Sequence, residues 1–85
     1  MIHDSIFSQF DSIFHNTDTA FLGSIGDLLF QVELLGEHQE YDDIAYWCQV
    51  CDEDQSVLFE QTLYGGENDV YSVEDAVQLA YNNVA

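Results

Sequence analysis

The chain has 85 residues, among them 17 Asp and Glu but no Lys or Arg, so its formal net charge is −17. This excludes direct binding of nucleic acid or anionic lipid, because proteins hold both mainly through Lys and Arg. A hydrophobic fraction of 47% excludes the composition of a disordered chain, which combines high net charge with low hydrophobicity. We therefore expect a single acidic α+β domain over residues 1–85, with a small core.

The first element that the sequence predicts is an amphipathic helix over residues 4–15. Its apolar residues recur at helical spacing: Ile6, Phe10, Ile13 and Phe14. Asp4 is a suitable N-cap, and Asp11 lies seven residues later, which would place both carboxylates on one stripe about 10.5 Å apart. The polar run at 16–19 ends the helix. Residues 20–26 fit either a short strand or a turn of helix.

Three strands are expected in the middle of the chain. Apolar and polar residues alternate from Leu28 to Leu35, which predicts a half-buried strand. Ile44 to Cys51 is rich in aromatic and β-branched residues and predicts a second strand. Ser56 to Tyr64 predicts a third, with alternate residues on opposite faces. The connections between consecutive strands are short, so we expect antiparallel hairpins.

A second helix is expected at the end of the chain. Gly65-Gly66 stops the third strand, and Ser72 with Asp75 forms a capping pattern. The apolar face of the helix consists of Val73, Ala76, Val77, Ala80, Tyr81 and Val84. The predicted fold is α+β in the order α-β-β-β-α, a three-stranded antiparallel sheet flanked by an N-terminal and a C-terminal helix.

The acidic residues gather at helix starts and hairpins, where such a fold is exposed. Solvated faces ordinarily mix both signs of charge, so the exclusion of one sign over the whole chain indicates a partner rich in Lys and Arg. The candidate partner-binding residues are Asp4, Asp11, Glu37, Glu40, Asp42, Asp43, Asp52, Glu53, Asp54, Glu67, Asp69, Glu74 and Asp75. Tyr41 and Tyr71 lie beside these clusters, where their rings are candidates for stacking on Arg side chains.

The cysteines and the acidic turns are two further candidate chemical sites. Cys48 and Cys51 form a C-x-x-C pair, but zinc needs four ligands and no second pair exists. A strand places the two thiols on opposite faces, so we expect two buried or half-buried thiols and no metal. The acidic run from Asp52 lacks the central Gly and the closing Glu of a calcium loop. With no nucleophile triad and no phosphate loop, we expect neither an enzyme nor a cofactor.

The charge of the chain is comparable to that of a short DNA duplex. At about one charge per 1.7 Å of duplex, 17 charges correspond to about 29 Å, close to the roughly 30 Å length of a compact domain of this size. In size and charge the chain resembles the DNA-mimic inhibitors, many encoded by phages and mobile elements. These include anti-CRISPR proteins, anti-restriction proteins and uracil-DNA glycosylase inhibitors. The resemblance covers the whole chain and is compositional, so it implies a mode of action and no individual binding residue.

The resemblance implies an inhibitor that occupies the Lys- and Arg-rich nucleic-acid groove of a host defence complex. An anti-CRISPR protein that binds a CRISPR effector is favoured, with an anti-restriction protein or a DNA-repair-enzyme inhibitor as alternatives. Two other classes remain open: a protein adapted to high salt, and an acidic adaptor or chaperone for a basic protein. The chain shows no signal peptide and no apolar run that could span a membrane, so the cytoplasm is expected, that of the bacterial host if the protein is encoded by a phage. The oligomeric state is left open.

Overall fold

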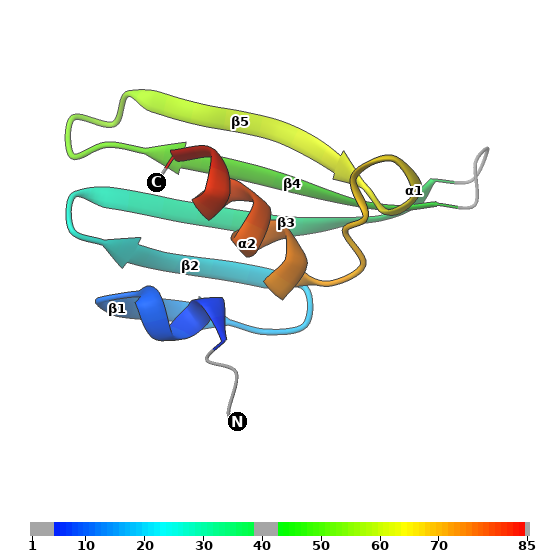
Figure 1. The fold of residues 1–85 in the computed structure, drawn as a ribbon, viewed down its shortest axis with the longest axis horizontal. Helices are drawn as coiled ribbons and strands as arrows, with labels where there is room; N and C mark the ends of the chain where they lie inside the picture. The colour runs from blue at the N-terminus through cyan, green and yellow to red at the C-terminus, as the bar shows by residue number, and fades with distance from the viewer. Residues whose placement is uncertain (1–4, 39–42, 85) are drawn as a thin grey trace.

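The computed structural model describes residues 5–38 and 43–84. Five antiparallel strands form one sheet in the order β1-β2-β3-β4-β5, so each strand pairs with its neighbours in the sequence (Figure 1). The strands are β1 (Ser12–Asn16), β2 (Ala20–Ile25), β3 (Leu28–His38), β4 (Asp43–Cys51) and β5 (Val57–Tyr64). The helical elements are the 3-10 helix η1 (Ile6–Gln9), the one-turn helix α1 (Gly65–Asn68) and the helix α2 (Val73–Val84).

The predicted three-stranded sheet between two helices is wrong, because the N-terminal part of the chain adds two strands to the sheet. Only η1 of the expected first helix is helical, and Ser12–Asn16 pairs with β2 as an outer strand. The apolar spacing is misleading here, since Ile13 and Phe14 are 44% and 64% exposed instead of facing a core. Both residue types favour strands, and a short isolated helix gains little on its own.

Residues 20–26, which fit either a strand or a helical turn by sequence, contain strand β2. Within it, Gly23 is buried beside two aromatic rings. A Cβ on Gly23 would lie 2.7 Å from Cζ of Phe21 and 3.0 Å from Cδ2 of Phe10. Glycine therefore leaves the space that these rings need to pack against the sheet.

The three central strands lie where the sequence predicts them. In β3, Phe30 and Val32 are each 1% exposed, whereas Gln31 and Glu33 face solvent, which confirms the predicted alternation. β3 continues beyond its predicted end, after an irregularity in its pairing with β4 between Leu34 and Gly36. Strands β4 and β5 follow as antiparallel neighbours.

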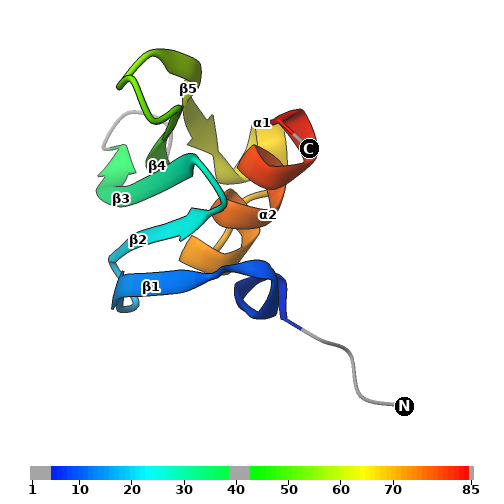
Figure 2. The ribbon, with the colours of Figure 1, turned by 90° about the vertical axis from the view of Figure 1, so that its left-hand side faces the viewer.

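Helix α2 packs across one face of the sheet, and its boundaries confirm the predicted second helix. The residues it buries are Val73, Ala76, Val77 and Ala80. Beside it, η1 and the residue after it place Phe7 and Phe10 against Phe21, with ring centroids 5.1 and 4.8 Å away. Figure 2 shows η1 and α2 on the same side of the sheet, while no described helix covers the other side.

Candidate functional site

The described acidic residues fall mainly in the turns and helix starts at two opposite ends of the sheet; Figure 1 shows these two ends of the ribbon. One end, here named the turn end, contains the β2–β3 and β4–β5 turns. Its acidic residues are Asp11, Asp27, Asp52, Glu53 and Asp54. The other end, here named the cleft end, contains the β1–β2 turn, α1 and the start of α2. Its acidic residues are Asp18, Glu67, Asp69, Glu74 and Asp75. Glu33 and Glu60 lie between the ends, on the uncovered face of the sheet.

At the turn end, two carboxylates hold backbone turns in place. Asp52 Oδ1 accepts hydrogen bonds from the backbone N–H groups of Asp54 and Ser56, both at 2.9 Å. Asp11 Oδ2 accepts the backbone N–H of Gly26 and thereby ties the start of β1 to the β2–β3 turn. Short acidic side chains often satisfy turn backbone in this way. These two carboxylates are therefore part of the fold's own hydrogen bonding.

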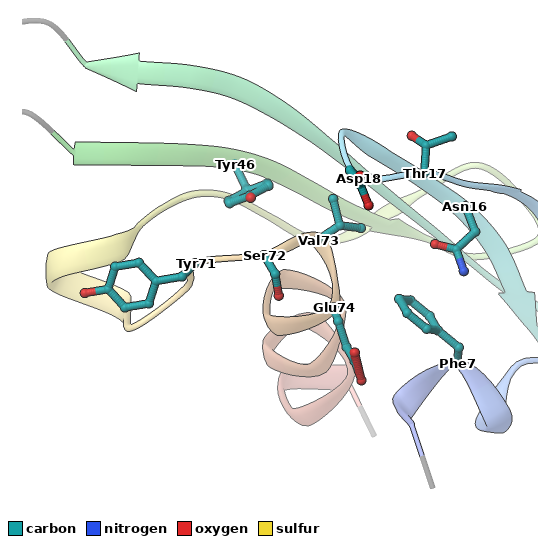
Figure 3. Close-up of a pocket in the computed structure, with 9 residues that line it drawn as sticks. All are labelled: Phe7, Asn16, Thr17, Asp18, Tyr46, Tyr71, Ser72, Val73 and Glu74. Atoms are coloured by element: carbon teal, nitrogen blue, oxygen red, sulfur yellow. The ribbon is translucent and has the colours of Figure 1, made fainter.

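At the cleft end, the acidic residues border a hollow. A cleft of about 470 Å³ opens between the β1–β2 turn, strand β4, η1 and the start of α2 (Figure 3). We name it the acidic cleft. It is lined by Phe7, Asn16, Thr17, Asp18, Tyr46, Tyr71, Ser72, Val73 and Glu74. Charged, hydroxyl and aromatic groups from four separate parts of the chain thus face one space.

Local hydrogen bonds shape the β1–β2 turn at the edge of the acidic cleft. Thr17 Oγ1 accepts the backbone N–H groups of Thr19 and Ala20 at 3.3 and 3.1 Å. The backbone N–H of Thr17 bonds to the carbonyl of Ala20 at 2.9 Å and closes the turn. Because Thr17 supplies these bonds, Asp18 makes no hydrogen bond within the described chain and stands exposed at the turn.

The opposite wall of the acidic cleft is the first turn of α2. Ser72 Oγ accepts the backbone N–H of Asp75 at 3.1 Å, and Asp75 Oδ2 accepts that of Tyr71 at 3.0 Å. The capping pattern predicted from the sequence is therefore confirmed. Ser5 Oγ donates to Glu74 Oε1 at 2.9 Å, which restrains the Glu74 carboxylate beside η1.

Tyr46 forms the floor of the acidic cleft. Its side chain is 3% exposed, so the ring belongs to the core, while the residue also lines the cleft. No buried side-chain oxygen or nitrogen of the described residues lacks a hydrogen-bond partner, so the Tyr46 hydroxyl, which bonds to none of these residues, is open to the solvent of the cleft. The pKa of Tyr46 is raised, first because burial disfavours the phenolate and then because the carboxylates of Asp75 and Asp18 repel its charge.

The structure places the sequence-predicted residues in two groups. The turn end brings together Asp11, Asp52, Glu53 and Asp54; the cleft end brings together Glu67, Asp69, Glu74 and Asp75. Asp4, Glu40, Asp42 and the aromatic candidate Tyr41 lie outside the described residues, as do the side chains of Glu37 and Asp43. The other aromatic candidate, Tyr71, lines the acidic cleft and is 59% exposed.

Two acidic residues at the strand turns are missing from the predicted site. Asp18 lies seven residues after Asp11 and stands at the β1–β2 turn, within the polar run at 16–19 that ends the expected first helix. Asp27 follows Gly26 between two apolar runs, and a Gly-Asp pair in that position is a hairpin signal. That local signal is sufficient to place Asp27 at a turn.

The two thiols have the predicted exposure. Cys48 is buried, its Sγ lies 3.8 Å from the Ala76 carbonyl oxygen, and burial raises its pKa to about 12. Cys51 is half-buried, and neither thiol is in a disulfide. Across the part of the chain that the structure describes, no three His, Cys, Asp or Glu side chains gather as a metal site.

None of the described helices is long and apolar enough to cross a membrane. Comparison with protein-family models, with characterised proteins and with solved structures found no significant match to this chain.

Proposed function

We propose that this protein inhibits a nucleic-acid-binding protein by occupying its Lys- and Arg-rich groove. One observation carries the proposal: the carboxylates stand on the surface of a well-packed sheet in a chain that has no Lys or Arg. Such a chain has no Lys or Arg side chain of its own to pair with them. Carboxylates fixed on a rigid surface offer Arg the same forked hydrogen bonds that phosphates offer.

The separation of the acidic ends supports mimicry of a nucleic-acid backbone. Asp18 and Asp27 flank strand β2, whose six residues span about 20 Å at 3.3 Å per residue. Along one DNA strand, charges recur every 3.4 Å, so this distance corresponds to about six phosphates. The two ends together therefore present negative charge over a length that a groove for nucleic acid would cover.

The target class favoured by this proposal is an RNA-guided CRISPR effector of a bacterial host. Such complexes hold their nucleic acids in positively charged channels and read the backbone geometry of the duplex. A small single-domain body suits blockage of such a channel. Restriction enzymes and DNA-repair enzymes have basic DNA grooves as well, and they form the second target class within the same mechanism.

The test is a DNA-displacement assay against both target classes. Purified protein is added to an RNA-guided nuclease complex and to restriction and repair enzymes, each with labelled target DNA. The proposal predicts loss of DNA binding and cleavage for at least one of them, in competition with DNA. It also predicts that inhibition weakens steeply between about 50 and 500 mM salt, because screening acts on the charges involved.

Two results would contradict the proposed function. One is a ternary complex in which the inhibited enzyme still holds its DNA in the same groove. The other is inhibition that is insensitive to salt. If an isolated basic peptide retained the full affinity of the target, an acidic adaptor for a basic protein would replace groove mimicry.

A further inference from the structure

The acidic cleft differs from the remaining acidic surface because its charges face each other across a hollow. Asp18 lies on the β1–β2 turn, and Glu74 lies on the opposite wall in the first turn of α2 (Figure 3). Asp75 is close enough to raise the pKa of Tyr46 together with Asp18. Two carboxylates from separate segments thus line the cleft, and a third, that of Asp75, lies near its floor.

The start of α2 also carries the positive end of the helix dipole, which opposes a cation. This dipole is equivalent to about half an elementary charge. Its backbone donors are in part already engaged, since Ser72 accepts the N–H of Asp75. The negative charge of the three nearby carboxylates exceeds the positive charge of the dipole. The acidic cleft is therefore strongly negative, and its occupant is a cation.

The hydroxyl of Tyr46 adds an unused polar group at the floor of the cleft. The side chain is 3% exposed, and its hydroxyl makes no hydrogen bond to the described residues but opens onto the cleft, because none of their buried side-chain polar atoms lacks a partner. A hydroxyl accepts hydrogen bonds as well as donating them. The cation that fits here is therefore one that donates several N–H bonds in different directions.

The aromatic side chains that line the acidic cleft distinguish between arginine and lysine as its occupant. Phe7 is half-buried, and its ring points from η1 toward the space between Asp18 and Glu74, whereas Tyr71 is 59% exposed at the edge of the cleft with its ring turned away from that space (Figure 3). A planar guanidinium stacks on such rings and donates five N–H bonds, whereas an ammonium group is a compact and strongly hydrated charge. These features together favour arginine over lysine.

We propose that the acidic cleft is the anchor site for an arginine side chain of the basic partner. The guanidinium lies between Asp18 and Glu74, donates to the Tyr46 hydroxyl and stacks against the ring of Phe7, which points toward this space (Figure 3). The inference rests on the proposed function for the identity of the partner, and it assigns to this cleft the central contact of that interface.

An NMR titration with a small arginine probe tests the site without any target protein. N-acetyl-L-arginine-N-methylamide is titrated into the isotope-labelled protein, with the lysine analogue at matched ionic strength as the comparison. We expect saturable shifts at the amides of Asp18, Tyr46 and Glu74, and weaker binding of the lysine probe. Asp18→Asn and Tyr46→Phe are each expected to lower the affinity for arginine by about three- to ten-fold.

Asp27→Asn is the matched control, because Asp27 is likewise an exposed turn aspartate but lies at the turn end. It removes the same charge and is expected to change the affinity for the arginine probe by less than about two-fold. Tyr46→Phe keeps the buried ring, so the fold remains intact while the hydroxyl is lost.

Three outcomes would overturn the anchor site: shifts that do not saturate, shifts spread equally over both ends, or equal losses in Asp18→Asn and Asp27→Asn. The test is separable from the proposed function. If the probe binds in the cleft but no nucleic-acid enzyme is inhibited, the anchor site stands and the proposed function is wrong. If inhibition occurs but Asp18→Asn leaves both inhibition and probe binding unchanged, the anchor site is wrong and the proposed function stands.

Discussion

The two acidic ends of the sheet carry similar charge and use it differently. At the turn end, Asp11 and Asp52 accept backbone N–H groups, so part of the negative charge is needed for the turns. At the cleft end, Asp75 likewise accepts the backbone N–H of Tyr71, but Thr17 supplies the hydrogen bonds of the β1–β2 turn and leaves the neighbouring Asp18 exposed. A carboxylate that holds its own backbone has less capacity for a partner than one that faces an open cleft.

This difference shows that the total charge of the chain does not by itself locate the binding site. The charge of −17 points to the class of partner, but it does not distinguish the two ends. What distinguishes them is the arrangement of groups around the charge. The acidic cleft combines the carboxylates of Asp18 and Glu74 with Tyr46 and Tyr71 around one hollow.

The largest effect is expected from neutralising two charges at a time. Asp18→Asn with Glu74→Gln removes the two walls of the acidic cleft and is expected to weaken DNA displacement by about 100-fold, equivalent to about 2.7 kcal/mol. Glu53→Gln with Asp54→Asn removes the same charge from exposed positions and is expected to cost about five-fold at most. Competition titrations against labelled DNA give both values.

Equal losses from the two double variants would contradict the comparison between the ends. They would mean that the groove responds to total charge and that no single contact dominates. Asp52 is unsuitable for this experiment, because its substitution also removes the acceptor of two turn hydrogen bonds.

The second prediction concerns the stability of the fold. Asp52→Ala is expected to lower the free energy of unfolding by about 1–3 kcal/mol, since the N–H groups of Asp54 and Ser56 lose a charged acceptor. Asp18→Ala is expected to change it by less than about 0.5 kcal/mol, as for most exposed positions. Urea unfolding curves measure both, with Asp52→Asn as a control that keeps the acceptor oxygen. A larger loss from Asp18→Ala would reverse the roles assigned to the two ends.

The sequence predicts the C-terminal two thirds of the fold better than the N-terminal third. Strand β3 alternates clearly, β4 is rich in aromatic and β-branched residues, and α2 carries both a capping pair and a continuous apolar face. The N-terminal segment has apolar residues whose spacing suits a helix, and only its pairing with β2 shows that Ser12–Asn16 is a strand. Local pattern cannot reveal a partner strand when the pattern itself is ambiguous.

The candidate site is predictable in part for the same reason. Hairpin turns are local, so the sequence correctly places the acidic run at 52–54 at a turn. The acidic cleft is not local, because the sheet order brings Asp18, Tyr46 and Glu74 together from distant positions in the chain. The sequence pattern predicts Tyr46 at the core or its edge, and nothing in that pattern indicates that it also lines a cleft.

The third prediction is that salt acts in opposite directions on folding and on binding. Raising NaCl from about 50 to 500 mM is expected to increase the melting temperature by a few degrees, because it screens repulsion among carboxylates that have no Lys or Arg to pair with. The same change is expected to weaken binding to the basic partner. Thermal unfolding and DNA displacement at matched salt concentrations measure the two effects. A melting temperature that falls as the salt concentration rises would contradict this prediction.

The smallest effect concerns the ionisation of Tyr46, which reports the field inside the acidic cleft. Burial and the charges of Asp75 and Asp18 raise its pKa above 10.0. The folded state therefore favours the neutral phenol of Tyr46. This preference contributes fully to the free energy of unfolding below pH 10, and the contribution is lost as the pH rises through the higher pKa of the folded state. The phenolate absorbance of the wild type minus that of Tyr46→Phe isolates this titration.

Two single variants connect this titration to the difference between the ends. Asp18→Asn is expected to lower the pKa of Tyr46 toward its ordinary value, because it removes one repelling charge from the wall of the cleft. Asp27→Asn removes a charge of the same sign at the turn end and is expected to leave that pKa unchanged. If both variants lowered it equally, Tyr46 would be sensing the net charge of the whole molecule. The cleft would then have no field of its own with which to select an arginine.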